Sequence, residues 1–289
     1  MRRKYWYLAL FFILFLLLLT FFIMMFCESI RNKKVSSVDI GAINSISITV
    51  LIDNNAYNDL KHPWGISIYI ETPNKTILFD AGPSPSDIEY NCKLLNIDLS
   101  KIDIIVLSHE HGDHIGGLSY VARYVHHDVV VYVPSGMSIG VKNWIKKLGF
   151  KIISIKNTTV ISKGIAIIGE LYGPPYEQAL AINVKDIGLI IFVGCSHPGV
   201  DRIVHKIVVE SENDPYLVLG GFHMLSATDE RINKVISNLI ADGIDYISPL
   251  HCSGDNFRNI MDKSFHDKYL ELHVGSRILV NSTGVYSKD

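Results

Sequence analysis

Three histidines and an aspartate stand within six positions, directly after a short apolar run. The run Ile104–Leu107 is typical of a buried strand, and SHEHGDHIGG (108–117) follows it. A histidine beside apolar surface must find a hydrogen-bond partner or a metal ion, so a core has no need of such a cluster. Imidazoles and a carboxylate are the donors that zinc and iron sites use. The motif therefore predicts a metal site after this strand, with four candidate ligands: His109, His111, Asp113 and His114.

Three further histidines occupy equivalent places along the chain. His197 in VGCSHPGV, His223 in LGGFHM and His251 in SPLHCSGD each come just past an apolar strand run. We expect these side chains near the same site, and the cysteines beside two of them, Cys195 and Cys252, close together. The other histidines lack this setting and are interpreted as surface or packing residues: His62, His126, His127, His205, His266 and His273.

The surrounding pattern predicts an α/β fold. Residues 45–52 (SISITVLI) alternate as a half-buried strand, whereas GLIIFVGC (188–195) is apolar throughout. Residues 200–208 and 232–240 each carry one apolar helical stripe. The second of these helices is expected to begin near Ser226, with Asp229 completing a capping box. Such helices and strands imply sheets that are covered by helices.

Charge and cysteine content exclude several classes of protein. The chain has 27 Lys and Arg against 29 Asp and Glu. A nucleic-acid-binding protein should carry a basic face, so we expect no nucleic-acid partner. The four cysteines form no CxxC pair, which argues against a zinc ribbon or a disulfide framework.

The N-terminal segment Tyr5–Cys27 contains no charged residue. Roughly 20 apolar residues suffice for a transmembrane helix, so we predict a single-pass membrane anchor in residues 1–27 that contacts the bilayer through residues 5–27. A cleaved signal peptide is the alternative, but no small-residue cleavage site follows. Basic residues flank both ends, which leaves the orientation open. Residues 28–44 are expected to be a linker, and 45–289 the catalytic domain.

The strand ending in LFDAG, the SHEHGDH motif and the single histidines after later strands together resemble the metallo-β-lactamase fold superfamily. The resemblance implies a four-layer αββα sandwich with metal ions at one edge. It assigns His109, His111 and His197 to one ion, and a second set to another: Asp113, His114 and His251. Asp80 of LFDAG would orient a ligating imidazole, although a simple turn role is the alternative. One or two divalent ions are implied, with zinc favoured over magnesium, manganese or iron.

Within that superfamily, LFDAGPS, NIDLSKIDIIVLSHEHGDHIGGL, GCSHPG, GGFHM and PLHCSG resemble the dihydropterin–ribofuranosylaminobenzene phosphate synthase group. The resemblance implies either a diphosphate-releasing transferase of methanopterin biosynthesis or a metal-dependent hydrolase. The predicted anchor departs from that group's soluble form, so we favour a membrane-anchored hydrolase of a phosphorylated or ester-type small molecule. A non-catalytic metal-binding sensor is the third hypothesis.

The remaining site residues receive provisional roles. Asp113 is expected to handle protons together with a histidine, and His223 to face the substrate or bind one ion. Because VLGGFHM supplies no carboxylate to bridge two ions, we expect either a weakly bound second ion or a pair of ions bridged only by solvent hydroxide. The turns that contain Ser196, Ser253 and Gly254 could hold phosphate oxygens or be simple tight turns.

Overall fold

The computed structural model describes residues 14–22, 24–25, 37–55 and 59–287. The chain divides into two units, Met1–Ser37 and Val38–Asp289. In the first unit, the described residues 14–22 and 24–25 are helical.

The predicted transmembrane helix is not supported by the described residues. Among them, no helix is both long enough and apolar enough to cross a bilayer. Residues 5–13, 23, 26 and 27 of the predicted anchor, and residues 28–36 of the predicted linker, lie outside the described part of the chain.

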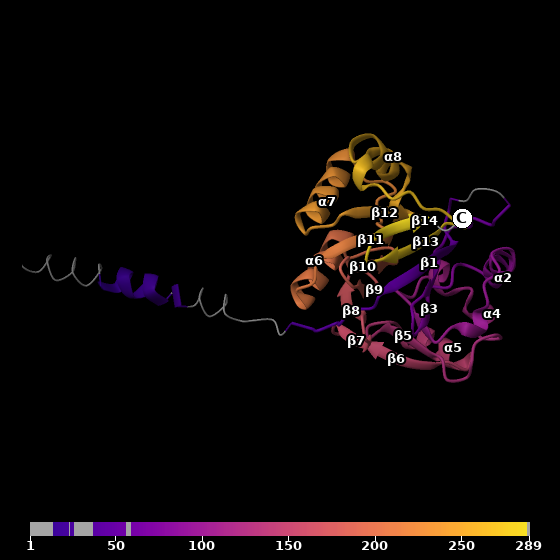
Figure 1. The fold of residues 1–289 in the computed structure, drawn as a ribbon. Coiled ribbons are helices and arrows are strands. Elements are labelled where there is room, and N and C mark those ends of the chain that lie inside the picture. The colour runs from indigo at the N-terminus through magenta and orange to yellow at the C-terminus, as the bar shows by residue number, and fades with distance from the viewer. Residues whose placement is uncertain (1–13, 23, 26–36, 56–58, 288–289) are drawn as a thin grey trace, which may run out of the picture. The chain divides into compact units, whose positions relative to one another are not determined.

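Two β-sheets form the centre of the second unit (Figure 1). Within the described residues the first sheet has eight strands, in the order β14 (Gly284–Ser287), β13 (Arg277–Asn281), β1 (Ser45–Ile52), β2 (Ser67–Glu71), β3 (Thr76–Phe79), β4 (Ile104–Val106), β5 (Val130–Pro134) and β6 (Lys151–Ile155). The second, counted over the same residues, has six, in the order β12 (Tyr246–Leu250), β11 (Pro215–Gly221), β10 (Gly188–Val193), β9 (Tyr176–Val184), β8 (Ile165–Tyr172) and β7 (Thr159–Ser162).

Helices cover the outer face of each sheet. The helices of the described chain are α2 (Pro85–Leu94), α3 (Gly112–Ile115), α4 (Leu118–Val121), α5 (Ile139–Lys147), α6 (Val200–Ser211), α7 (Asp229–Ala241) and α8 (Asp255–Ser264), with 3₁₀ turns η1 (Leu99–Lys101), η2 (His251–Ser253) and η3 (His266–Lys268). Apolar residues of α2, α4 and α5 pack on the first sheet, and those of α6, α7 and α8 on the second.

The main core lies between the two sheets. Phe79 of β3 and Phe192 of β10 meet there with ring centroids 6.2 Å apart. Burying one such side chain contributes roughly 1.5–3 kcal/mol. With helices outside both sheets, the unit has the four-layer αββα arrangement that the sequence predicts.

The structure differs from the expected boundaries at two places. Ile40 and Ile43 are buried, and the Ile43 amide donates to the Asn183 carbonyl at 3.0 Å, so the compact unit begins at Val38 rather than at Ser45. Helix α7 is capped by Thr228, whose hydroxyl accepts from the Arg231 amide, and not by Ser226. Thr228 directly precedes the first helical residue, which is where a capping hydroxyl can reach the free amides.

Candidate metal centre

The candidate site is built from turns at the carboxyl ends of several strands. Asp80 follows β3, Ser196 follows β10, His223 follows β11 and His251 follows β12. All four have positive φ angles, between 45° and 60°. This left-handed conformation costs of order 1–3 kcal/mol in a residue with a side chain, and it is commonest at functional sites. Here it turns the chain sharply where each strand ends, so that side chains from both sheets reach one place.

Three histidines form the first ligand group, which we call the three-histidine group: His109, His111 and His197. Their donor atoms all lie within 4.8 Å of one another. His109 Nε2 is 3.1 Å from His111 Nδ1. His109 is buried whereas His111 is exposed, so solvent reaches this group from one side.

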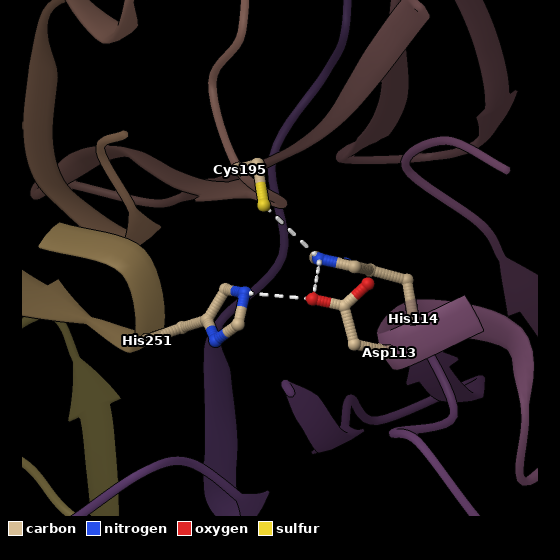
Figure 2. A group of neighbouring side chains, drawn as sticks. All are labelled: Asp113, His114, Cys195 and His251. Carbon is tan, nitrogen blue, oxygen red and sulfur yellow. Dashed lines mark hydrogen bonds and ion pairs between the residues drawn. The ribbon is translucent and has the colours of Figure 1, made fainter. Parts of the chain in front are cut away.

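A second cluster, which we call the mixed group, lies next to it and comprises Asp113, His114, Cys195 and His251 (Figure 2). The ring centroids of His109 and His114, one from each group, are 4.0 Å apart. In the mixed group the His114 Nε2 is 3.2 Å from the Cys195 sulfur, and the His251 Nε2 is 3.3 Å from Asp113 Oδ2. The structure therefore brings together both sets of residues that the sequence suggests, and it adds Cys195.

Buried partners fix the imidazole rings from behind. In four of the five ligand histidines, Nδ1 faces a fixed group: Ser108 Oγ at 2.9 Å from His109, Asp80 Oδ2 at 2.6 Å from His114, Glu177 Oε2 at 2.9 Å from His197, and Asn54 Oδ1 at 3.0 Å from His251. A partner on one ring nitrogen sets the tautomer and leaves the other free to bind a metal. Asp80 thus lies where the sequence predicts, behind His114.

One buried atom indicates directly that the residues fit a metal ion. His251 Nε2 is buried and has no hydrogen-bond partner among the described residues, although it points toward Asp113. Leaving such a nitrogen unsatisfied costs about 1–3 kcal/mol. Burial and the neighbouring imidazoles of His114 and His197 also hold the pKa of His109 well below its usual range, so this ring stays neutral. Neutral imidazoles with free lone pairs suit a divalent cation.

Two carboxylates of the site, those of Asp113 and Glu177, have lowered pKa values, whereas burial raises the pKa of Asp80 against the opposing effect of His114. Burial raises the pKa of Asp113, but His251 and His114 outweigh this effect and bring it down to about 2. Burial lowers the pKa of His114, yet the carboxylate of Asp80 raises it overall. For Glu177, too, burial opposes ionisation, and the contact with His197 lowers the pKa on balance.

His223 lies beside the three-histidine group. Its ring centroid is 4.7 Å from that of His197, and its side chain is exposed. Its amide donates to the sulfur of Cys252 at 3.3 Å. Cys195, His223 and Cys252 form a third set of donor atoms within 4.8 Å of one another, so the two cysteines are close together, as the sequence suggests.

Ser196 and Ser253 lie in the two turns for which the sequence leaves phosphate binding or a simple tight turn open. The Ser196 hydroxyl donates to the Gly221 carbonyl at 2.7 Å, and the Ser253 hydroxyl to the Leu250 carbonyl at 2.6 Å. Both side chains are buried. Gly254 is buried as well and begins α8 with a φ of 83°. The hydroxyls therefore stabilise the turns, and phosphate binding by the backbone amides of these turns stays a prediction.

Sequence reasoning missed three residues of the site. Glu177 stands at the start of β9, where its carboxylate accepts from the amides of Ser196 and His197. Its charge in the otherwise apolar strand YEQALAINV was a usable signal. Asn54 comes from the turn after β1, and no local pattern marks it. Cys195 lies two residues before His197 in GCSH, and the sequence places it beside Cys252 without suggesting it as a candidate ligand.

Comparison with known proteins gives the family. The model of the family described as the metallo-beta-lactamase superfamily matches residues 66–176. The 7,8-dihydropterin-6-methyl-4-(beta-D-ribofuranosyl)-aminobenzene-5'-phosphate synthase of Methanocaldococcus jannaschii is 31% identical, over 83% of this chain and 99% of its own length. An uncharacterized protein of the same organism is also 31% identical, over 80% of this chain and 99% of its own length.

A solved structure agrees with this assignment at the level of the fold. A metal-dependent hydrolase of the beta-lactamase superfamily superposes with a TM-score of 0.69 at 24% identity, over 80% of this chain and 98% of that one. The chain belongs to the metallo-beta-lactamase superfamily.

Proposed function

We propose that the protein is a metal-dependent hydrolase of a phosphorylated or ester-type small molecule. The observation that carries the proposal is the half-open three-histidine group, in which His109 is buried and His111 is exposed. Three protein ligands with one open side are typical of a catalytic zinc site, whereas structural sites are closed by four. Water has direct access on the exposed side, and hydrolysis needs water.

Zinc is the ion that we propose, because imidazole and thiol donors favour it over magnesium and manganese. When bound, a zinc ion supplies a Lewis acid and lowers the pKa of water. His109, His111 and His197 would hold one ion, and the mixed group would hold a second.

The protein's own groups account for proton handling and substrate orientation. Asp113 carries a carboxylate whose side chain is 21% exposed, so it can accept a proton from a water molecule at the edge of the site. His223 stands exposed beside His197, where it can donate a hydrogen bond to a phosphate or carbonyl oxygen. Trp64 is 47% exposed and its ring lies 4.6 Å from His251, which favours a substrate with a planar or apolar part.

Diphosphate-releasing transfer is the second candidate, and the 31% identity to the synthase over 99% of its length supports it. Transfer requires that water be kept from the reacting phosphorus or carbon atom. The exposed His111 and His223 argue for the hydrolase.

Turnover in ¹⁸O-labelled water distinguishes the two. Zinc-loaded full-length protein would be assayed with a phosphoester panel, and with a pterin diphosphate with and without an aminobenzene acceptor. Hydrolysis places ¹⁸O in the product without an acceptor, whereas transfer releases unlabelled diphosphate only when the acceptor is present. Absence of turnover on both substrate classes, with zinc bound, would contradict the proposal.

A further inference from the structure

No carboxylate that could bridge two metal ions directly follows strand β11. Strand β11 ends at Gly221, and Phe222 and His223 follow. Two dications a few ångströms apart repel each other strongly unless negative ligands offset the charge. Asp113 is the one carboxylate among the donor atoms of both groups. Apart from solvent hydroxide, a second anionic ligand can come only from a donor residue of another type.

We propose that Cys195 is that ligand, and that its thiolate completes a four-ligand metal site with Asp113, His114 and His251. The Cys195 sulfur is 3.2 Å from His114 Nε2, and the donor atoms of all four residues lie within 4.8 Å of one another (Figure 2). Asp113 Oδ2 is 3.8 Å from His114 Nε2 and 3.3 Å from His251 Nε2. Ligand atoms around a tetrahedral zinc ion are separated by about 3.3–3.6 Å, given bond lengths of about 2.0–2.3 Å. The three separations of 3.2, 3.3 and 3.8 Å are close to these values, and the other pairs lie within 4.8 Å.

An independent observation points to the same place. His251 Nε2 is buried, makes no hydrogen bond of standard geometry among the described residues, and lies 3.3 Å from Asp113 Oδ2 (Figure 2). The other nitrogen of this ring is held by Asn54, and the Asp53 carboxylate accepts from the His251 amide. The ring is therefore held with its free nitrogen toward the Asp113 carboxylate, where a metal ion bound by both side chains would satisfy it.

The turn that carries Cys195 has little freedom to move. A Cβ added at Gly194 would lie 2.1 Å from the Ser108 hydroxyl, and one at Gly221 would lie 2.8 Å from the Cys252 sulfur. At these two glycines the end of β10 therefore packs closely against the loop that carries His109 and against the neighbouring turns. Cys195 is thus held by tight backbone packing, and a preorganised donor loses little entropy when it binds an ion.

Cys252 is the obvious competitor, and its contacts give it another role. Its sulfur accepts from the His223 amide at 3.3 Å and donates to the Cys195 carbonyl at 3.6 Å. Both contacts tie the thiol to the main chain of the neighbouring turns. The third partner of its set, His223, is exposed, whereas Cys195, His114 and His251 are all buried. We therefore assign the metal ligand to Cys195 and a positioning role to Cys252.

A thiolate at this position has two chemical consequences. With Asp113 it supplies two negative charges to one dication, and the thiol proton passes to solvent when the ion binds. A soft sulfur donor also selects zinc over magnesium and manganese. Four protein ligands close the mixed group, which leaves the open position for substrate in the three-histidine group.

Cobalt substitution of the full-length protein tests the assignment. A thiolate bound to Co²⁺ gives a near-ultraviolet charge-transfer band that imidazole and carboxylate ligands do not give. We expect the band in wild-type protein and in Cys252→Ser, and its loss in Cys195→Ser together with one of the two ions. Cys195→Asp should recover the ion without the band. Retention of the band in Cys195→Ser, or its loss in Cys252→Ser, would overturn the assignment.

Zinc X-ray absorption of wild-type protein keeps the proposal testable if a variant fails to fold. At two ions per chain we expect an average of one sulfur for every two zinc ions, at about 2.3 Å. An average of zero, or of one sulfur per zinc, would contradict a single thiolate ligand. The inference rests on the proposed metal centre alone, and because neither readout measures turnover, its failure is distinguishable from failure of the hydrolase proposal.

Discussion

The two ligand groups differ most in their exposure to solvent. In the three-histidine group, His111 is exposed while His109 is buried. In the mixed group His114, Cys195 and His251 are all buried, and the Asp113 side chain is 21% exposed. The groups stand side by side, so the difference does not come from their place in the fold. It supports the proposed division of work, in which the mixed group would hold charge in place and the three-histidine group would meet water and substrate.

The carboxylates that contact the ligand imidazoles also differ between the two groups. His114 is held by Asp80, a carboxylate that also accepts from the Ser108 amide and hydroxyl at 2.7 Å each. His197 is held by Glu177, whose carboxylate also fixes the turn after β10. Glu177 thus holds a ring of the three-histidine group, whereas Asp80 holds His114 directly and reaches His109 through the Ser108 hydroxyl.

Loss of the exposed ligand should have the largest effect. His111→Ala leaves the three-histidine group one donor short. We expect kcat/KM to fall by more than about 100-fold, because mutation of a residue that only hydrogen-bonds to a ligand already lowers metal affinity or activity by about 10–100-fold. Thermal unfolding of the metal-free protein should change little, since an exposed side chain contributes little burial. His127→Ala, an exposed histidine outside the site, is the matched control. Wild-type activity and metal content in His111→Ala would remove this group from the catalytic account.

The two carboxylates behind the rings provide a paired test. Asp80→Asn should weaken zinc binding in the mixed group by about 10–100-fold, and weaken it less in the three-histidine group, which Asp80 reaches only through Ser108. Glu177→Gln should weaken zinc binding in the three-histidine group by about 10–100-fold. Competition titration with a zinc chelator measures both affinities in each variant. If either variant lowered the affinity for both ions equally, the two groups would not bind their ions separately.

In the metal-free protein, His109 and His114 should affect the pH dependence of stability in opposite directions. The pKa of His109 is lowered by burial, so the unfolded chain binds more protons and stability falls as the pH drops below about 6.5. The pKa of His114 is raised, chiefly by Asp80 against the effect of burial. Its contribution is therefore complete below about pH 6.5 and is lost as the pH rises through the higher folded value.

Urea midpoints between pH 5 and 8 check these signs. His109→Gln should reduce the loss of stability toward acid, and His114→Gln should increase it. The same change of slope in both variants would contradict the assigned directions.

The smallest effect is expected for His223→Asp. The sequence alone predicts a weak second ion because no carboxylate follows β11, and this variant would then strengthen it markedly. If Cys195 supplies the charge instead, the variant should tighten the second ion by less than about 10-fold. A larger gain of affinity in a zinc titration would indicate that the missing carboxylate after β11 is the main reason why the second ion binds weakly.

Much of the site follows from local patterns along the chain. His109, His111, Asp113 and His114 are adjacent in sequence, and His197 and His251 each follow an apolar strand, so strand ends and donor chemistry suffice to find them. The helices over 200–211 and 229–241 follow in the same way from their apolar stripes.

The residues that escaped prediction depend on register between distant strands. Asn54 reaches His251 across 197 residues of sequence, and Glu177 reaches His197 across 20. Such contacts are set by which strands neighbour one another and how the two sheets face, and no local pattern encodes that.

Zinc content after equilibrium dialysis of metal-free full-length protein tests the central claim most directly, because that claim is two separate ligand groups for two ions. We predict two zinc ions per chain in the wild type and in His127→Ala. One ion should remain in His111→Ala, held by the mixed group, and one in Cys195→Ser, held by the three histidines. A wild-type protein that binds one ion or none would contradict the account.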